Sequence, residues 1–319
     1  MRAIRIHDHG GPEVLTSEDI HAPTPGPGQV LVTTSRTGVN FIETYQREGV
    51  YDVDLPFLPG SEGAGVVAAV GEGVSSLSVG QRVMTSQGTG TYAEQFLVNA
   101  DQAAQVPDSI GDDDAGALPL QGFTAHYLTR STYEVGPETT AVITAAAGGV
   151  GGLAIQLMKQ LGATVIGLTS SQDKAETARQ LGADHVLPYE GFADAVLELT
   201  DGEGADVAYD SVGKTTFDES LAAVKTRGTV VLFGGASGQV PPFDLQRLNA
   251  MGSLYVTRPS LNAYLRTPEE LQWRARELFE AVDAGLRVRV GGSYSLADAA
   301  SAHTDLESRN TQGKLLLVP

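Results

Sequence analysis

The sequence predicts a two-domain α/β protein, with one β-rich domain and one doubly wound domain built on a parallel sheet. Three observations support this prediction. A chain of 319 residues is long enough for two domains of ordinary size. Up to about residue 120, short β-favouring runs are separated by proline and glycine. From about residue 139, strand and helix patterns alternate instead.

The β-rich part begins at the first residues of the chain. Its strands are expected to be short, because turn signals such as Pro23–Gly28 interrupt the β-favouring runs. Short strands with turns between them are typical of a barrel or a compact β domain. The predicted strands comprise residues 2–6, 29–34, 65–70 and 81–84.

The doubly wound part begins with a short apolar strand at residues 141–144. After a glycine-rich turn, Leu153, Leu157 and Leu161 recur every four residues, which predicts a helix with one apolar face. Alternation of strands with helices over this length implies a parallel sheet that is covered on both faces. The remaining predicted strands are residues 164–168, 184–187, 206–209, 229–233 and 253–256.

The last part of the chain adds a helix and a strand. Thr267 is a favourable N-cap, Pro268 suits the first helical position, and Gly285 suits the end of the helix. The apolar residues between them lie on one helix face. Residues 314–318 are predicted to form a final buried strand.

Composition excludes several classes of function. The formal net charge of −18 repels phosphate, which disfavours nucleic acid and anionic membrane surfaces as partners. The absence of cysteine excludes disulfides, thiolate nucleophiles and cysteine-ligated zinc. No apolar run approaches the ~20 residues of a membrane span, and the first residues resemble a strand rather than a signal peptide. We therefore expect a soluble, cytoplasmic protein.

A glycine-rich turn at residues 149–154 predicts a dinucleotide site. Gly149, Gly151 and Ala154 form the pattern G-x-G-x-x-A between a predicted strand and a predicted helix, which is the context that the motif requires. The first glycine permits a tight turn, the second lets a pyrophosphate approach the backbone, and the small third residue allows close packing. Unpaired N–H groups at the helix N-terminus then attract the anion.

The choice of cofactor depends on the end of the second strand of this domain. An NAD site usually has an acidic residue there, whereas this chain has Ser170 and Ser171, followed by Lys174. Hydroxyl donors and a cation suit a 2′-phosphate, so NADPH is favoured over NADH. The alternative for Lys174 is an ordinary place on a solvated helical turn, and the neighbouring Asp173 weighs against a phosphate.

Motifs along the whole chain resemble those of a known family. Three of them together are similar to the medium-chain dehydrogenase/reductase superfamily, and three more narrow the resemblance to its zinc-free quinone oxidoreductase branch. They occur in the family's order and span essentially the full length. The first three are Gly38–Tyr45, Leu58–Gly65 and Ala145–Gly151, and the others are Asp210–Gly213, Tyr255–Leu261 and Glu307–Arg309.

The resemblance implies a specific domain organisation. A GroES-like β-barrel catalytic domain would comprise residues 1–123 and 262–319, and a doubly wound Rossmann cofactor domain would comprise residues 124–261. The active site would lie in the cleft between them. Family members are commonly homodimers joined through their cofactor domains, so a homodimer is expected.

The resemblance also implies that no metal is bound and that three polar residues line the catalytic cleft. In zinc-dependent relatives a cysteine ligand falls within residues 39–41 and a histidine occupies the place of Ser61, and neither ligand exists here. The implied cleft residues are Asn40, Tyr45 and Tyr51, whose amide and phenols can donate to a carbonyl without titrating near neutral pH. Aromatic packing is the alternative for the two tyrosines.

Seventeen positions are expected to bind the cofactor, some from the motifs described above and the others from the resemblance. Lys174 matches the residue that faces the 2′-phosphate, and Tyr189 matches the one that stacks near the adenine. Two departures affect the substrate side, since Gln121 replaces a common lysine and Glu43 a common aspartate. The full set is Thr124, Tyr127, Gly148, Gly149, Val150, Gly151, Ser170, Ser171, Lys174, Tyr189, Phe233, Gly234, Gly235, Val256, Thr257, Arg258 and Arg309.

The function that these features favour is zinc-independent hydride transfer from NADPH to a small quinone. An enone or enoyl reductase is the alternative within the same class, because polarising a carbonyl serves both reactions. A protein that binds the cofactor for a structural role, as crystallin-like relatives do, is the alternative from another class.

Overall fold

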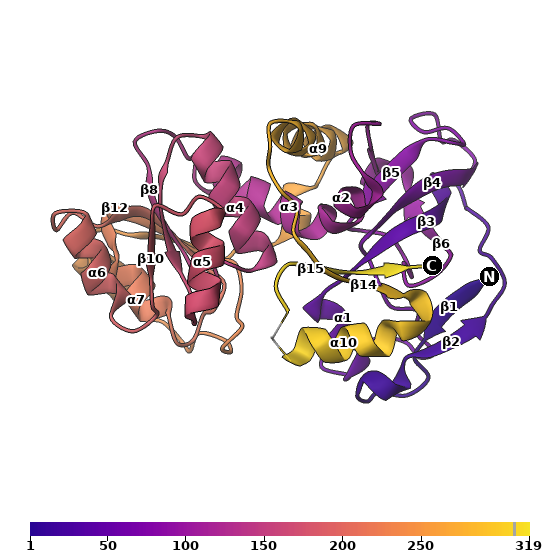
Figure 1. Ribbon diagram of the computed structural model, residues 1–319, viewed down its shortest axis with the longest axis horizontal. Helices are drawn as coiled ribbons and strands as arrows, with labels where there is room; N and C mark the ends of the chain where they lie inside the picture. The colour runs from indigo at the N-terminus through magenta and orange to yellow at the C-terminus, as the bar shows by residue number, and fades with distance from the viewer. Residues whose placement is uncertain (309–310) are drawn as a thin grey trace. The chain divides into compact units, whose positions relative to one another are not determined.

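The computed structural model describes residues 1–308 and 311–319 of the chain. The chain divides into two compact units. The first unit combines Met1–Phe123 with Leu265–Pro319, and the second is the continuous segment Thr124–Tyr264. Both ends of the chain therefore belong to the first unit (Figure 1).

The second unit contains a six-stranded sheet in which every pairing is parallel. Its strand order, β10-β9-β8-β11-β12-β13, is that of the dinucleotide-binding Rossmann fold, as predicted. The strands are β8 (Thr140–Ile143), β9 (Thr164–Leu168), β10 (His185–Leu187), β11 (Ala205–Asp210), β12 (Val224–Leu232) and β13 (Tyr255–Thr257).

Helices cover both faces of this sheet (Figure 1). Ile166 and Leu168 of β9 pack into one apolar core with Phe192 and Phe217 of two helices. Gly167 faces the opposite way, towards Ala178 of another helix. The helices on the Ile166 side are α6 (Phe192–Leu199) and α7 (Phe217–Ala222), and Gly167 faces α5 (Gln172–Gln180), which follows α4 (Gly149–Gln160).

Shorter elements complete the second unit. The boundary between the units falls inside α3 (Pro119–Tyr127), which continues as a π-helical turn at Leu128–Thr132. Near the end of the unit, α8 (Gln246–Ala250) precedes β13, and a 3₁₀ turn at Leu261–Tyr264 follows it.

The first unit is built around β3 (Gln29–Val39). This strand pairs with three others, β4 (Gly63–Val70), β6 (Gln95–Asn99) and β15 (Lys314–Val318). Because β15 belongs to the segment Leu265–Pro319, its pairing with β3 joins the two distant segments of the unit. The sheet order is β14-β15-β3-β4-β5-β7, with β14 (Val290–Ser295), β5 (Arg82–Thr85) and β7 (Ala104–Gln105); a separate pair is formed by β1 (Arg2–Arg5) and β2 (Thr16–Asp19).

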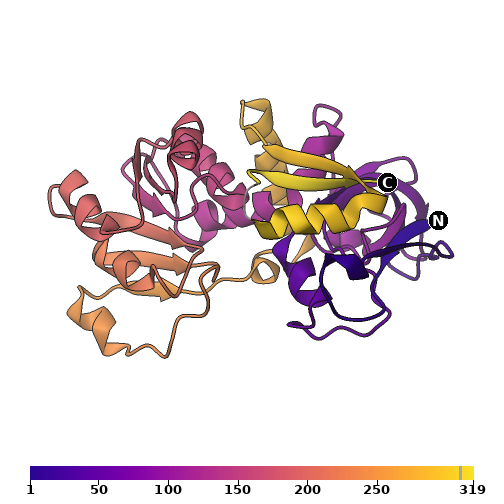
Figure 2. The same cartoon turned by 60° about the horizontal axis from the view of Figure 1, so that its bottom comes forward.

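Two helices of this unit matter for the site. Helix α1 (Phe41–Arg47) starts two residues after β3, and α10 (Ala299–Ser308) lies against the β14–β15 pair (Figure 2). Ala302 of α10 is buried with Leu317 of β15 in one apolar core. The other helices are α2 (Asp112–Ala117) and α9 (Pro268–Asp283), with 3₁₀ turns at Pro12–Val14, Ala100–Gln102 and Leu296–Asp298.

Several predicted elements have the predicted bounds, and others are longer. The strands at residues 164–168 and 314–318 agree with the prediction, and α9 begins at Pro268 behind the N-cap Thr267. The prediction for β3 was five residues too short, because this strand continues past Thr34 through an irregularity in its pairing with β4. No helix within residues 1–308 or 311–319 is both long and apolar enough to cross a membrane.

Candidate functional site

The glycine-rich motif at residues 149–154 opens α4, and together with residues 144–148, which connect it to β8, it forms the glycine-rich turn of the structure. Gly148 is the N-cap of α4, and the first helical N–H groups belong to Gly149, Val150 and Gly151. A Cβ on Gly151 would lie well within 3.0 Å of the Ala145 carbonyl oxygen. The turn therefore needs glycine at this position for its own backbone packing, in addition to the pyrophosphate approach that the sequence suggested.

The turn lies where the strand order of the sheet reverses, next to β11. The Thr144 and Ser211 hydroxyl oxygens are 3.0 Å apart, and the Ser211 N–H donates to the Thr144 hydroxyl at 2.8 Å. In doubly wound sheets, ligands bind outside the carboxyl ends of the strands at this reversal. The predicted dinucleotide turn is therefore at the position where such a ligand binds.

A buried carboxylate fixes the loop after β11. Asp210 is fully buried and accepts hydrogen bonds from the Val212 and Gly213 N–H groups, at 2.8 and 3.0 Å. The Thr216 and Ser220 hydroxyls also donate to it. Four donors satisfy the charge that burial would otherwise destabilise. The sequence contained this loop only as a family motif, without its hydrogen bonds.

The predicted 2′-phosphate residues lie together at the end of β9. Ser170 and Ser171 are exposed, and Lys174 is half-buried in the first turn of α5. Ser171 is the N-cap of this helix, and its hydroxyl accepts from the Lys174 N–H at 3.4 Å. This cap fixes the backbone of Lys174 beside the two serines.

Tyr189, which follows β10, contacts the glycine-rich turn directly. Its hydroxyl oxygen accepts a hydrogen bond from the Ala145 N–H at 2.8 Å. Burial raises the pKa of the Tyr189 phenol above its usual value, so the group stays neutral at physiological pH. Ala145 has a positive φ of 49°, an uncommon conformation for a residue with a side chain.

The predicted residues around the ends of β12 and β13 also lie at the carboxyl ends of these strands. Phe233, Gly234 and Gly235 follow β12, and a Cβ on Gly234 would lie within 3.0 Å of the Ser211 backbone. This close approach to the Ser211 backbone explains why residue 234 is a glycine. Val256 and Thr257 end β13, and Arg258 follows them.

Two predicted cofactor residues near the start of the second unit are buried. Thr124 and Tyr127 are buried, and the Tyr127 ring stacks on Tyr264 with centroids 4.4 Å apart and an interplanar angle of 7°. Within the second unit, this ring is thus part of the core. Arg309 lies outside the described residues.

In the first unit, Asn40 connects several buried groups. It is the N-cap of α1, and its backbone N–H donates to the Glu43 carboxyl at 2.7 Å. Its side-chain oxygen accepts from the Lys314 ammonium, and its side-chain N–H₂ donates to Glu62 at 2.9 Å. The amide of this predicted catalytic residue is therefore occupied at both ends.

Glu62 and Lys314 form a buried ion pair beside Asn40. Both side chains are almost fully buried, and the Lys314 ammonium contacts one carboxylate oxygen of Glu62. The other oxygen accepts from the Leu120 N–H at 2.7 Å. A Cβ on Gly38 would lie within 3.0 Å of both charged side chains, so glycine is required there to make room for the pair.

Glu43 is a fully buried acid next to this pair. Burial, together with the neighbouring charge of Glu62, raises its pKa to about 8, although Lys314 acts in the opposite direction. At neutral pH the group is therefore protonated for most of the time. Among the described residues, no hydrogen-bond partner contacts its Oε1 atom.

The two predicted catalytic tyrosines lie together and are accessible. Tyr45 and Tyr51 are 38% and 51% exposed, and their rings meet edge to face with centroids 5.7 Å apart. Phe41 and Ile42 of α1 are exposed as well. An apolar surface with two phenols at it can contact a flat ring and donate hydrogen bonds to its oxygens.

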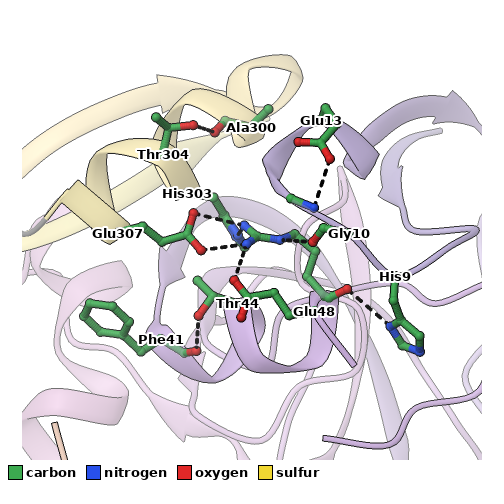
Figure 3. A network of polar contacts seen from close by, with 12 residues as sticks. His9, Gly10, Glu13, Phe41, Thr44, Glu48, Ala300, His303, Thr304 and Glu307 are labelled. Atoms are coloured by element: carbon green, nitrogen blue, oxygen red, sulfur yellow. Dashed lines mark hydrogen bonds and ion pairs between the residues drawn. The ribbon is translucent and has the colours of Figure 1, made fainter. Parts of the chain in front are cut away.

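A second buried cluster surrounds Arg47 at the other end of α1 (Figure 3). The Arg47 guanidinium donates to Glu307 at 2.6 Å, to the Gly10 carbonyl at 3.0 Å and to His303 Nδ1 at 3.1 Å. Because arginine can only donate, His303 Nδ1 accepts, and its Nε2–H points to the Tyr92 hydroxyl. Burial, assisted by Arg47, lowers the pKa of His303 to about 4.

Sequence reasoning missed the two buried clusters. Lys314 was recognised only as the start of a buried strand, and Arg47 and His303 carried no recognisable signal. A lysine at the head of an apolar strand was the one available indication. No group of three or more metal-ligating side chains occurs within the part of the chain that the structure describes.

Two family models match this chain. The alcohol dehydrogenase GroES-like domain matches residues 26–108, and the zinc-binding dehydrogenase domain matches residues 149–276. The first agrees with the β-rich unit, and the second includes most of the Rossmann sheet.

Full-length relatives give a narrower assignment. A quinone oxidoreductase of Pseudomonas aeruginosa is 46% identical over 100% of this chain and 99% of its own. A 2-haloacrylate reductase of Burkholderia sp. is 40% identical, covering 100% and 99%. A native mycobacterial structure complexed with NADPH is 48% identical with a TM-score of 0.95, covering 100% of both chains. The chain belongs to the medium-chain dehydrogenase/reductase superfamily, in its quinone oxidoreductase branch.

Proposed function

We propose that the protein is a zinc-independent oxidoreductase that transfers a hydride from NADPH to a small quinone. The observation that carries the proposal is the match over the full chain to relatives named quinone oxidoreductases. The Rossmann unit, with its glycine-rich turn at the strand-order reversal, supports the cofactor part of the proposal.

The residues of the second unit fit NADPH. Gly149, Val150 and Gly151 present the first N–H groups of α4, which suit a pyrophosphate. Ser170 and Lys174 suit the 2′-phosphate, since the four residues that follow β9 directly carry no carboxylate and Asp173 comes only after them. When bound, NADPH supplies the hydride.

The residues of the first unit fit the acceptor. The exposed phenols of Tyr45 and Tyr51 can donate hydrogen bonds to a quinone oxygen, on which negative charge develops as the hydride is added. One proton from solvent then completes the hydroquinone. Asn40 was predicted to share this role, and its occupied amide favours the two tyrosines as the donors.

Reduction of an activated carbon–carbon double bond is the second candidate. A specific observation favours it, because a relative that is similar over its full length is named a 2-haloacrylate reductase. The same two phenols could donate to the carbonyl or carboxyl oxygen conjugated to such a bond. The quinone remains first because more of the similar relatives carry that name.

A substrate panel separates these candidates. NADPH oxidation by the purified protein is measured with small quinones, enones and 2-haloacrylates at one ionic strength. We expect the highest kcat/KM with a quinone. A higher value with a haloacrylate or an enone would favour the second candidate, and NADPH binding without any turnover would favour a structural role. A cytoplasmic location and a homodimer remain predictions, and sedimentation of the purified protein tests the dimer.

A further inference from the structure

Helix α1 has an inverted arrangement of polar and apolar residues. Its buried side chains are Glu43, Thr44 and Arg47, all of them polar, whereas Phe41 and Tyr45 are exposed to 42% and 38%. Helices on protein surfaces normally bury their apolar face and expose their charges. A helix of seven residues is also too short to be stable by itself. Forces other than apolar burial must therefore hold α1 in place.

The N-terminal end of α1 is held by what we call the Lys314 cluster, consisting of Lys314, Glu62, Asn40 and Glu43. The helix N-cap, Asn40, lies between the two members of a buried ion pair and hydrogen-bonds to both. Glu43, in the first turn, accepts from the Asn40 backbone N–H. These contacts connect the start of the helix to strand β15 and to the segment before β4.

The C-terminal end of α1 is held by the Arg47 cluster, consisting of Arg47, His303, Glu307, Tyr92 and Gly10. The Arg47 side chain is 1% exposed, and its donors meet the carboxylates of Glu307 and Glu48, an imidazole and a backbone carbonyl (Figure 3). The Gly10 N–H also donates to the Arg47 carbonyl oxygen at 3.1 Å. The last turn is thereby attached to α10 and to the segment around Gly10.

We propose that the Lys314 and Arg47 clusters position α1 with its apolar side outward, as a fixed platform for the ring of the acceptor. Lys314 and Arg47 are then positioning residues, which act through the helix on Tyr45. The inference rests on the proposed function, because it assigns the outward side to the quinone or enone that the phenols would contact.

The free-energy cost of burying charges favours a positioning role for the two clusters over a role in stabilising the helix alone. Burying paired charges contributes little net stability compared with apolar side chains of the same volume. If the helix had only to be stable, turning Phe41 and Ile42 inward would be the more effective arrangement. Charged groups have a specific geometry that apolar contacts lack, so two clusters can define both the axis and the rotation of a short helix.

The test compares variants that remove each cluster with a matched variant elsewhere. Arg47→Met and Lys314→Met are each measured for quinone kcat and KM, for the Kd of NADPH, and for hydrogen exchange of residues 41–51. The control is Arg274→Met, because Arg274 is equally buried in the same unit and pairs with Glu270 at 2.7 Å within another helix, α9. Removing one partner of a buried pair can unfold a protein. The paired variants Arg47→Met/Glu307→Gln and Lys314→Met/Glu62→Gln therefore accompany the single ones.

We expect kcat/KM for the quinone to fall on the order of 10- to 100-fold in the cluster variants, as for a misplaced catalytic group. Exchange in residues 41–51 should accelerate, and the Kd of NADPH should stay within about twofold, since the predicted cofactor residues other than Arg309 lie in the other unit. Arg47→Lys should restore part of the activity, because it keeps the charge. The Arg274 control should keep its kcat/KM even if its Tm falls.

Two results would overturn the inference. One is a folded cluster variant with normal kcat and KM despite faster exchange in α1, which would reduce the clusters to ordinary stabilising contacts. The other is equal loss of activity in the Arg274 control. If the wild type turned over no quinone, enone or haloacrylate, the proposed function would be wrong, whatever the clusters do. Unchanged exchange in residues 41–51 of the variants would then separately exclude the clusters as the supports of α1.

Discussion

The hydroxyl of Tyr189 accepts a hydrogen bond from the backbone N–H of Ala145, and this contact connects the segment after β10 to the second residue after β8. Ala145 has a positive φ and lies in the glycine-rich turn, so the bond helps to hold an uncommon backbone conformation. The tyrosine was predicted from the sequence as an adenine contact. Its hydroxyl has this second, structural partner within the turn.

Tyr189→Phe keeps the ring and removes only this hydrogen bond. We expect the Kd values of NADPH and NADH to rise together by a few-fold to tenfold, because the pyrophosphate is common to both and a lost hydrogen bond costs about 1 kcal/mol. Fluorescence titration with both cofactors measures the change. Tyr209→Phe is the control, since the Tyr209 hydroxyl donates to the Leu128 carbonyl at 3.0 Å in the same unit. Unchanged affinity for both cofactors in the Tyr189 variant would refute the role of the hydroxyl.

Lys174→Ala should act on only one of the two cofactors. A charge-assisted hydrogen bond from Lys174 to the 2′-phosphate contributes about 1.5–3 kcal/mol, so the Kd of NADPH should rise roughly ten- to a hundredfold. The Kd of NADH should be nearly unchanged. Both are measured at one ionic strength, because salt screens exposed charges. Equal wild-type affinity for the two cofactors would show that the serines and the lysine do not select NADPH.

Gly151→Ala should disturb the turn even before any cofactor binds. The added Cβ meets the Ala145 carbonyl, which is backbone and cannot move without distorting the turn. We expect a lower Tm and a loss of NADPH affinity. Gly136→Ala in the same unit is the control, since a Cβ there meets nothing within 4 Å among the described atoms. A Gly151 variant with the Tm and Kd of the wild type would contradict the close approach.

Glu43 should make the stability of the protein depend on pH. Its pKa is raised to about 8 in the folded state, mainly by burial, against an ordinary value of 4.5. Between these values the folded state keeps a proton that the unfolded state has released. The contribution of the Glu43 proton to the free energy of unfolding is thus fully present below pH 4.5. It is lost as the pH rises towards 8, at up to about 1.4 kcal/mol per pH unit.

Glu43→Gln removes this titration while keeping an acceptor for the Asn40 N–H. We expect the Tm of the variant, relative to the wild type, to increase steadily from about pH 5 to about pH 8 and then to level off. Differential scanning calorimetry over this range measures it. A constant difference in Tm across the range would mean that Glu43 ionises in the folded protein as it does in water.

Strong chelators should leave activity unchanged. The chain has no cysteine, and Ser61 stands where zinc-dependent relatives have a histidine. Turnover of NADPH with a quinone is compared before and after treatment with a chelator and dialysis. Zinc present in stoichiometric amount and lost together with activity would exclude a zinc-independent reaction.

The sequence was sufficient to predict the Rossmann unit because its signals are local. The repeat of Leu153 and Leu157 and the glycine-rich turn each depend on neighbours within a few residues, and β9 has the predicted bounds. The length of β3 was less predictable, because pairing with β4 and β15 extends the strand through half-buried residues such as Arg36.

The arrangement of α1 could not be predicted from its own residues. Its polar side chains are buried and its apolar side chains are exposed. The polar partners of Asn40 and Arg47 are Glu62, His303 and Lys314, which are not neighbours of the helix in the sequence. A helical pattern shows which residues share a face, but only the tertiary contacts determine which face is buried. The resemblance identified Tyr45 and Tyr51 as candidates, and it carried no information about what holds them.

The pairing of β15 with β3 has a consequence for the order in which the protein matures during synthesis. The cofactor unit is one continuous segment and can fold as soon as it leaves the ribosome. Glu62 is translated about 250 residues before Lys314, its only cationic partner within the described residues, so its counter-charge arrives last. The nascent chain therefore forms the Rossmann sheet of its proposed cofactor site before its proposed acceptor site, which needs Lys314 of β15 as the partner of Glu62.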